Sequence, residues 1–127
     1  MKKKILCVCV RGMNRSKYLA QYLRRKGYST RFGGVEPYEK PEYKWTPVSQ
    51  KKIDWADVII IVRKRVAPIL KKKFNINKKK LIVFDVTDSK RLIPEKFKSL
   101  RELNHKEFNR VWTYPQLRKA IKPYLPI

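Results

Sequence analysis

Short apolar runs alternate with segments of helical pattern, and this alternation constrains the fold more than any other feature of the sequence. Residues 5–8, 57–62 and 78–86 carry the apolar, often β-branched runs expected of strands that are covered on both faces. An alternating segment at 28–32 adds a fourth strand, which we expect the Gly33-Gly34 pair to end. Helical patterns occupy 14–26, 63–74 and 115–124, and another helix is expected to begin at Thr46-Pro47. This order predicts an α/β fold of three layers, a four-stranded parallel sheet flanked by helices.

The charge balance points to anionic partners. The chain of 127 residues contains 33 Lys and Arg against 10 Asp and Glu, a formal net charge of +23. Hyperthermophile surfaces pair their lysines with glutamates, so the shortage of acids argues against thermal adaptation. We expect the basic surface to attract nucleic acid or another polyanion.

Cysteine usage and hydropathy bear on location. The only cysteines, Cys7 and Cys9, lie two apart on one expected strand, a geometry that does not suit a disulfide and so favours a reducing compartment. The apolar run near the N-terminus spans about six residues, below the ~7–15 of a secretory signal. No stretch approaches the ~20 apolar residues of a membrane helix. We therefore predict no membrane insertion and a cytoplasmic location.

The segment CVRGMNRS, residues 9–16, joins the first expected strand to the first expected helix. Such a loop is an anion site, because its backbone N–H groups are unpaired and the helix dipole favours negative charge. Cys9 there would persist as a thiolate able to attack phosphorus, and the planar guanidinium of Arg15 could grip two phosphate oxygens. Ser16 could donate a hydrogen bond to the sulfur, and Gly12 would supply the positive φ of a tight loop. The predicted phosphate-binding residues are Val10, Arg11, Gly12, Met13, Asn14, Arg15 and Ser16.

A carboxylic acid is also needed, to protonate the leaving oxygen and later to activate water. Asp85 and Asp88 follow the last apolar run, and the carboxyl ends of parallel strands share one edge of a sheet with Cys9. The sequence does not decide which of the two is the acid: Asp85 could instead cap a turn or hold Arg15, and both could be structural. We expect no metal or other cofactor, because the lone His105 has no second His or Cys beside it.

These residues resemble the low-molecular-weight protein tyrosine phosphatases. Cys-x5-Arg-Ser is similar to the family's phosphate loop, and KKLIVFDVTDSK resembles the fourth strand and Asp-x-x-Asp turn of a short branch of predicted phosphatases. TRFGGV and TPVSQKKIDWADVIIIV are similar to the segments around its second and third strands, so the likeness covers about residues 3–90. The resemblance implies a phosphotyrosine-type protein phosphatase with Cys9 as nucleophile, Arg15 as the phosphate-binding arginine and Asp88 as general acid. Its substrate would be a phosphorylated protein or a small phosphomonoester.

The sequence departs from the family pattern at three places. Arg11 and Gly12 stand where the family usually has Gly then Asn, and Ser89 and Lys90 stand where Pro or Asp and then an aromatic usually follow the acid. Residues 91–112 look like an insertion within a single domain, 1–127.

Other functions stay open at the level of sequence. A non-catalytic protein could use the same loop and basic surface to bind phosphate or nucleic acid, and a phosphatase could act on a nucleic-acid phosphate. Arsenate reductases share the architecture, but they need further cysteines, and none follows Cys9.

Overall fold

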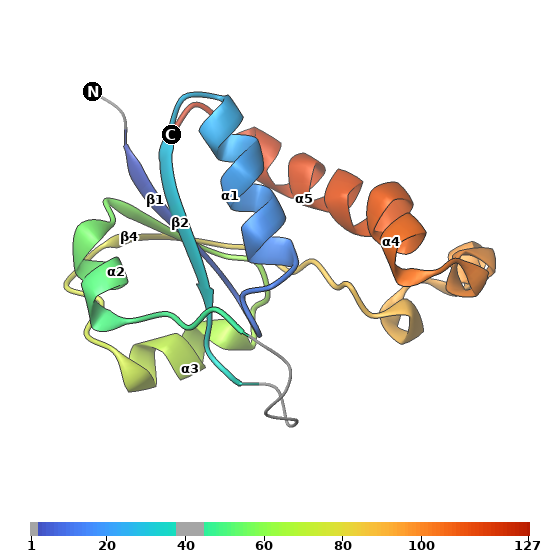
Figure 1. Cartoon of the computed structure of the whole chain (residues 1–127), viewed down its shortest axis with the longest axis horizontal. Helices are drawn as coiled ribbons and strands as arrows, with labels where there is room; N and C mark the ends of the chain where they lie inside the picture. The colour runs from blue at the N-terminus through green and yellow to red at the C-terminus, as the bar shows by residue number, and fades with distance from the viewer. Residues whose placement is uncertain (1–2, 38–44) are drawn as a thin grey trace. The chain divides into compact units, whose positions relative to one another are not determined.

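A parallel sheet organises the first part of the chain in the computed structural model, which describes residues 3–37 and 45–127 (Figure 1). Its strands are β1 (Lys4–Cys9), β2 (Ser29–Gly34), β3 (Val58–Ile61) and β4 (Lys80–Val83). Their order is β2-β1-β3-β4, and every pair is parallel. The four-stranded parallel sheet predicted from the apolar runs is confirmed.

Helices cover both faces of this sheet. α1 (Arg15–Arg25) packs on β1 and β2 through Leu19 and Leu23, and the Thr30 hydroxyl of β2 donates to its Ala20 carbonyl over 2.9 Å. α2 (Gln50–Trp55) and α3 (Val66–Lys73) lie against the other face. Because strand side chains alternate between faces, one apolar core forms there, which includes Leu6, Val8, Ile53, Ile59, Ile61, Val66 and Leu70. The three-layer arrangement is therefore also confirmed.

One expected boundary is confirmed and another was wrong. β2 ends with the Gly33-Gly34 pair, as expected, and these glycines pair with Val8 and Cys9 of β1. Thr46-Pro47 does not start a helix: its backbone runs beside Gly34, whose N–H donates to the Thr46 carbonyl over 2.7 Å. α2 begins three residues later, where the Ser49 side chain accepts a hydrogen bond from the Lys52 N–H at 3.2 Å.

The chain divides into two compact units, residues 1–85 and 86–127. The second unit is helical and contains α4 (His105–Phe108) and α5 (Tyr114–Ile121), joined by a π-helical turn at Asn109–Thr113. Short 3-10 segments, Lys90–Leu92, Glu95–Glu102 and Lys122–Tyr124, complete it. The helical pattern at 115–124 is thus confirmed, whereas a single domain with an insertion at 91–112 stays a prediction.

No helix within the described residues is long and apolar enough to cross a membrane. The cytoplasmic location stays a prediction.

Candidate active site

Cys9 is the last residue of β1, at the carboxyl end of the sheet. Its side chain is buried, and so is that of Cys7 two residues earlier on the same strand. Burial, together with the neighbouring Cys9, raises the pKa of the Cys7 thiol, so Cys7 is held as an unreactive neutral group. The two cysteines thus differ in position: Cys7 lies within β1, whereas Cys9 ends β1 and directly precedes the loop to α1.

Two hydrogen-bonding groups converge on the Cys9 sulfur. The backbone N–H of Gly12 donates to Sγ over 3.1 Å, and the Ser16 hydroxyl oxygen lies 3.1 Å from the same atom. Ser16 is fully buried in the first turn of α1. The Cys9 sulfur therefore lies at the N-terminus of α1, with one backbone N–H and one hydroxyl group within hydrogen-bond distance.

The loop between Cys9 and α1 is held tightly by the end of β2 and the segment after it. Gly12 has φ +74°, and a Cβ on it would lie 2.3 Å from the Thr46 carbonyl oxygen. The Val10 carbonyl accepts hydrogen bonds from the N–H groups of Val35 and Glu36, both at 2.9 Å. The positive φ expected of Gly12 is thus present, and the surrounding backbone requires it.

Gly34 makes this close approach possible. A Cβ at Gly34 would lie 2.3 Å from the carbonyl carbon of Arg11 and 2.5 Å from the Gly12 nitrogen. Sequence reasoning treated the Gly33-Gly34 pair as the end of a strand and missed this role. The detectable signal was two consecutive glycines at the carboxyl end of a strand, where a second backbone can pack without hindrance.

Arg15 and Arg11 occupy different surroundings. Arg15, the first residue of α1, is buried, with 7% of its surface exposed. The Arg11 guanidinium instead donates to the Pro37 carbonyl and lies 3.9 Å from the Glu36 carboxylate, which also pairs with Arg65 at 3.3 Å. Arg11 therefore interacts with the segment after β2, and its expected contact with a bound phosphate stays a prediction.

The two candidate acids fall in different units. Asp85 follows β4 and accepts a hydrogen bond from the Lys64 N–H at 3.1 Å, while the Arg63 guanidinium lies 3.3 Å away. Asp85 therefore caps the turn between β3 and α3, the alternative that the sequence had left open. Asp88 belongs to the second unit, where the Ser89 N–H donates to the Thr87 hydroxyl over 3.0 Å and shapes the turn around it.

Residues 3–37 and 45–127 contain no group of three or more His, Cys, Asp or Glu side chains placed to hold a metal ion.

Comparison with known proteins finds a likeness at the level of structure alone. No protein-family model matches the sequence, and no curated protein matches it. Among solved structures, Vibrio vulnificus Wzb in complex with benzylphosphonate superposes with a TM-score of 0.69 at 15% identity, covering 98% of this chain and 97% of that one. The YwlE arginine phosphatase from Geobacillus stearothermophilus gives a TM-score of 0.66 at 15% identity, covering 96% and 90%. A low-molecular-weight phosphotyrosine phosphatase from Vibrio cholerae O395 gives 0.64 at 16% identity, covering 97% and 94%.

This chain has the fold of the low-molecular-weight protein tyrosine phosphatases. The resemblance drawn from CVRGMNRS and the strand segments is therefore confirmed for the fold. At these identities the likeness carries the architecture and leaves the roles of individual residues to be tested.

Proposed function

We propose that this chain is a phosphatase that hydrolyses phosphomonoesters through a phosphocysteine formed at Cys9. The observation that carries the proposal is the convergence of the Gly12 N–H and the Ser16 hydroxyl on the Cys9 sulfur, each at 3.1 Å, at the N-terminus of α1. A structural cysteine needs no such donors, whereas a nucleophilic thiolate does. The shared fold with solved phosphatases supports the same reading.

In the first step the substrate phosphate would rest on the N–H groups of residues 10–16, with Arg15 binding two of its oxygens. The Cys9 thiolate attacks phosphorus, so the sulfur–phosphorus bond forms as the bond to the leaving oxygen breaks. Asp88, in its protonated form, gives its proton to that oxygen. The loop amides and Arg15 supply the positive charge that the transition state requires, so the step needs no metal.

In the second step the Asp88 carboxylate takes a proton from a water molecule as its oxygen attacks phosphorus. The sulfur–phosphorus bond breaks, inorganic phosphate leaves and the thiolate of Cys9 is restored. The Ser16 hydroxyl, already 3.1 Å from the sulfur, stabilises the departing thiolate. Ser16 thus has its main effect on breakdown of the phosphoenzyme.

We propose a phosphorylated protein as the natural substrate, with phosphotyrosine as the first candidate. The solved neighbours include tyrosine phosphatases and an arginine phosphatase, so phosphoarginine is the informative comparison. Ser89 and Lys90 stand where the family usually has an aromatic residue after the acid. This difference predicts weaker selectivity for an aromatic leaving group.

The test is hydrolysis of para-nitrophenyl phosphate, a phosphotyrosine peptide and a phosphoarginine peptide, in EDTA with a reductant. Wild type should turn over the nitrophenyl ester, and Cys9→Ser should abolish turnover while unfolding at the same urea concentration. Cys7→Ser is the matched control, because it changes the same residue type on the same strand. Retained activity in Cys9→Ser, or none in folded wild type, would overturn the proposal.

Two further variants assign the acid. Asp88→Asn should lower the rate on the phosphotyrosine peptide by about 10²–10⁴-fold, and lower it less on the nitrophenyl ester, whose leaving group needs little protonation. Asp85→Asn is the control, since an amide oxygen can still accept from the Lys64 N–H. A leaving-group-dependent loss in Asp85→Asn would transfer the role to Asp85.

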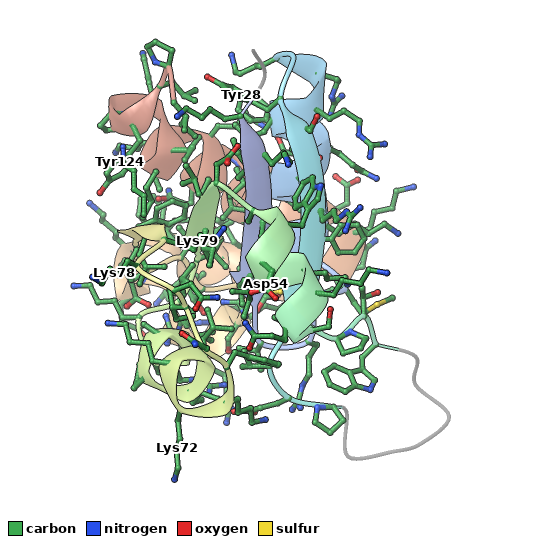
Figure 2. All side chains as sticks on the ribbon, turned by 90° about the vertical axis from the view of Figure 1, so that its left-hand side faces the viewer. Tyr28, Asp54, Lys72, Lys78, Lys79 and Tyr124 are labelled. Carbon is green, nitrogen blue, oxygen red and sulfur yellow. The ribbon has the colours of Figure 1, made fainter. Side chains whose placement is uncertain are left out.

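A second proposed function, binding of a polyanion, has a separate support. Six lysines, the lysine cluster, gather at the C-terminus of α3 and the start of β4: Lys71, Lys72, Lys73, Lys78, Lys79 and Lys80. Lys72 and Lys78 point away from the fold in Figure 2. Lys78, Lys79 and Lys80 lie at the amino end of β4, whereas the Lys73 ammonium donates to the carbonyl of Val35, which follows β2, over 2.6 Å. We propose that it binds nucleic-acid phosphates, because a dense array of exposed ammonium groups suits a regular row of negative charge.

Binding of a fluorescent DNA duplex, measured against salt, tests this function. Replacing four exposed lysines of the cluster, Lys71, Lys72, Lys78 and Lys80, by Gln should reduce the salt-dependence slope by up to about four. The matched control replaces the exposed lysines Lys98, Lys106, Lys119 and Lys122, which removes the same charge from the second unit. Equal effects of the two variants would show attraction by net charge alone and overturn the proposed surface.

A further inference from the structure

A second group of basic side chains lies at β2, the edge strand opposite β4. A pocket of about 290 Å³ opens beside β2, the strand at one end of the sheet order, and Figure 1 shows α1 and α2 on either side of that strand. Three cationic side chains line it, one from each of these elements: Arg24, Arg31 and Lys52. Ala20, Gln21, Thr30, Phe32 and Thr46 complete its wall. No carboxylate lines the pocket within residues 3–37 and 45–127.

Two of the three cations, Lys52 and Arg31, are held in place by groups that do not neutralise them. The Lys52 ammonium donates to the carbonyl oxygens of Phe32 and Pro47, at 3.0 and 2.8 Å. The Arg31 guanidinium lies over the Trp55 ring, 4.4 Å from its centroid. Carbonyl groups and an aromatic face orient a cation but carry no net negative charge. The pocket therefore keeps an excess of positive charge.

The positive charges of Lys52 and Arg31 also repel each other. Burial first, and the charge of Arg31 second, lower the pKa of the Lys52 ammonium. Like charges brought together raise the free energy of the folded state unless an anion lies between or beside them. An anion in the pocket would remove this cost, so the electrostatics and the cavity favour the same kind of ligand.

One residue of the pocket, Thr46, also contacts the loop between Cys9 and α1. Thr46 lines the pocket, its hydroxyl lies 3.6 Å from the Met13 sulfur, and its carbonyl oxygen packs against Gly12. The same carbonyl accepts the Gly34 N–H at 2.7 Å. A ligand that contacts Thr46 would therefore touch a residue that itself contacts the loop after Cys9.

We propose that this pocket is a second anion site, which binds a phosphate group distinct from the one held by the catalytic loop. Two guanidinium groups and an ammonium offer many N–H donors, which suits a tetrahedral dianion with several acceptor oxygens. The phosphate group has two sources, free inorganic phosphate or a second phosphate on the substrate. Binding itself does not depend on turnover at Cys9.

Titration of the ¹⁵N-labelled protein with inorganic phosphate, at constant ionic strength, tests the site. Amide signals of residues 10–16 report the loop, and those of Thr30, Arg31 and Phe32 report the pocket, so the two events are read separately. The pocket signals should shift and saturate. Shifts confined to residues 10–16 would overturn the proposal and leave the proposed function untouched.

Neighbouring residues provide matched variants for this titration. Arg24→Gln should weaken the pocket's phosphate affinity by roughly ten-fold or more, because a charge-assisted hydrogen bond is lost. Arg25→Gln and Lys51→Gln remove the same charge from exposed positions that do not line the pocket, and should change it less than two-fold. Equal weakening by Arg24→Gln and Arg25→Gln would reduce the effect to net charge and overturn the site.

Two measurements on wild type complete the test. Phosphate should raise the pKa of the Lys52 ammonium, followed by its ¹³Cε signal, and an unchanged pKa would contradict the site without any substitution. Peptides with one phosphotyrosine, or with an added phosphoserine nearby, then separate the sources. If the doubly phosphorylated peptide has the lower KM and Arg24→Gln removes this difference, the ligand is a second phosphate on the substrate. If the two peptides have equal KM values, the ligand is free phosphate.

Discussion

Replacement of Gly12 by alanine is the sharpest structural prediction, because two separate costs meet at this residue. The first is conformational: φ is +74°, a region that costs an L-residue about 1–2 kcal/mol. The second is steric, since the added Cβ would lie 2.3 Å from the Thr46 carbonyl oxygen and 2.6 Å from the Gly34 nitrogen. Both atoms belong to the backbone, and overpacking of this kind costs about 1–3 kcal/mol. Gly12→Ala should therefore lower the free energy of unfolding by about 2–5 kcal/mol.

Two other glycines separate these costs. Gly27 has φ +102° and no atom within 4 Å of an added Cβ, so Gly27→Ala should show the conformational cost alone, about 1–2 kcal/mol. An added Cβ at Gly34 would lie 2.3 Å from the Arg11 carbonyl carbon, so Gly34→Ala should show the steric cost alone, about 1–3 kcal/mol.

Urea unfolding of the three variants and wild type provides the assay, with turnover of para-nitrophenyl phosphate as a second readout. Gly12→Ala and Gly34→Ala should lose activity, since both disturb the loop whose Gly12 N–H reaches Cys9, whereas Gly27→Ala should keep it. If Gly12→Ala were no less stable than Gly27→Ala and kept full activity, the packing described for the loop would be refuted. Gly34→Ala keeps the comparison informative if Gly12→Ala does not fold.

Three further outcomes follow from other contacts. Iodoacetamide should modify Cys9 and leave Cys7 untouched in the folded protein, because burial raises the pKa of the Cys7 thiol. Peptide mass spectrometry identifies the modified cysteine, and a label on Cys7 would contradict the prediction. Ser49→Ala should lower the free energy of unfolding by about 1 kcal/mol, measured in urea, since the cap of α2 is lost, and an unchanged value would count against that cap. The backbone N–H at the start of β1 lowers the pKa of Asp57, so Asp57→Asn should be less stable than wild type at pH 7. That deficit should vanish as the pH falls from about 3.8 through the lower folded-state pKa, and a deficit independent of pH would show another cause.

The sequence was most informative where packing decides structure. Residues 57–62 could be assigned to a strand because a continuous β-branched run is stable only when both faces are covered, and β3 is buried throughout. Cys9 could be placed at the end of β1 because a phosphate-type loop must follow a strand and precede a helix. These inferences rest on patterns within one segment.

Contacts between distant segments were harder to predict. Thr46-Pro47 has the composition of a helix start, but pairing with Gly34 keeps it extended, and that partner lies more than ten residues away. Arg11 was assigned to the phosphate by its place in the loop, yet its contacts with Glu36 and Pro37 depend on where the chain returns after β2. Local propensity carries no information about such partners.

For Asp85 and Asp88, too, the position along the chain was easier to predict than the contacts with distant residues. Their position after a strand was readable from the sequence, but only the structure shows that Asp85 is engaged by Lys64 and Arg63. Asp88 is the acid to test first because the family resemblance assigns it the role of general acid.

Trapping the phosphorylated enzyme tests the central claim most directly. Wild type and Ser16→Ala would be mixed with para-nitrophenyl phosphate, quenched within milliseconds and digested, and the peptides analysed by mass spectrometry. We predict phosphate on Cys9 in both proteins, with more retained in Ser16→Ala because its phosphoenzyme breaks down more slowly. Turnover with no phosphate on Cys9, or phosphate on another residue, would contradict the account.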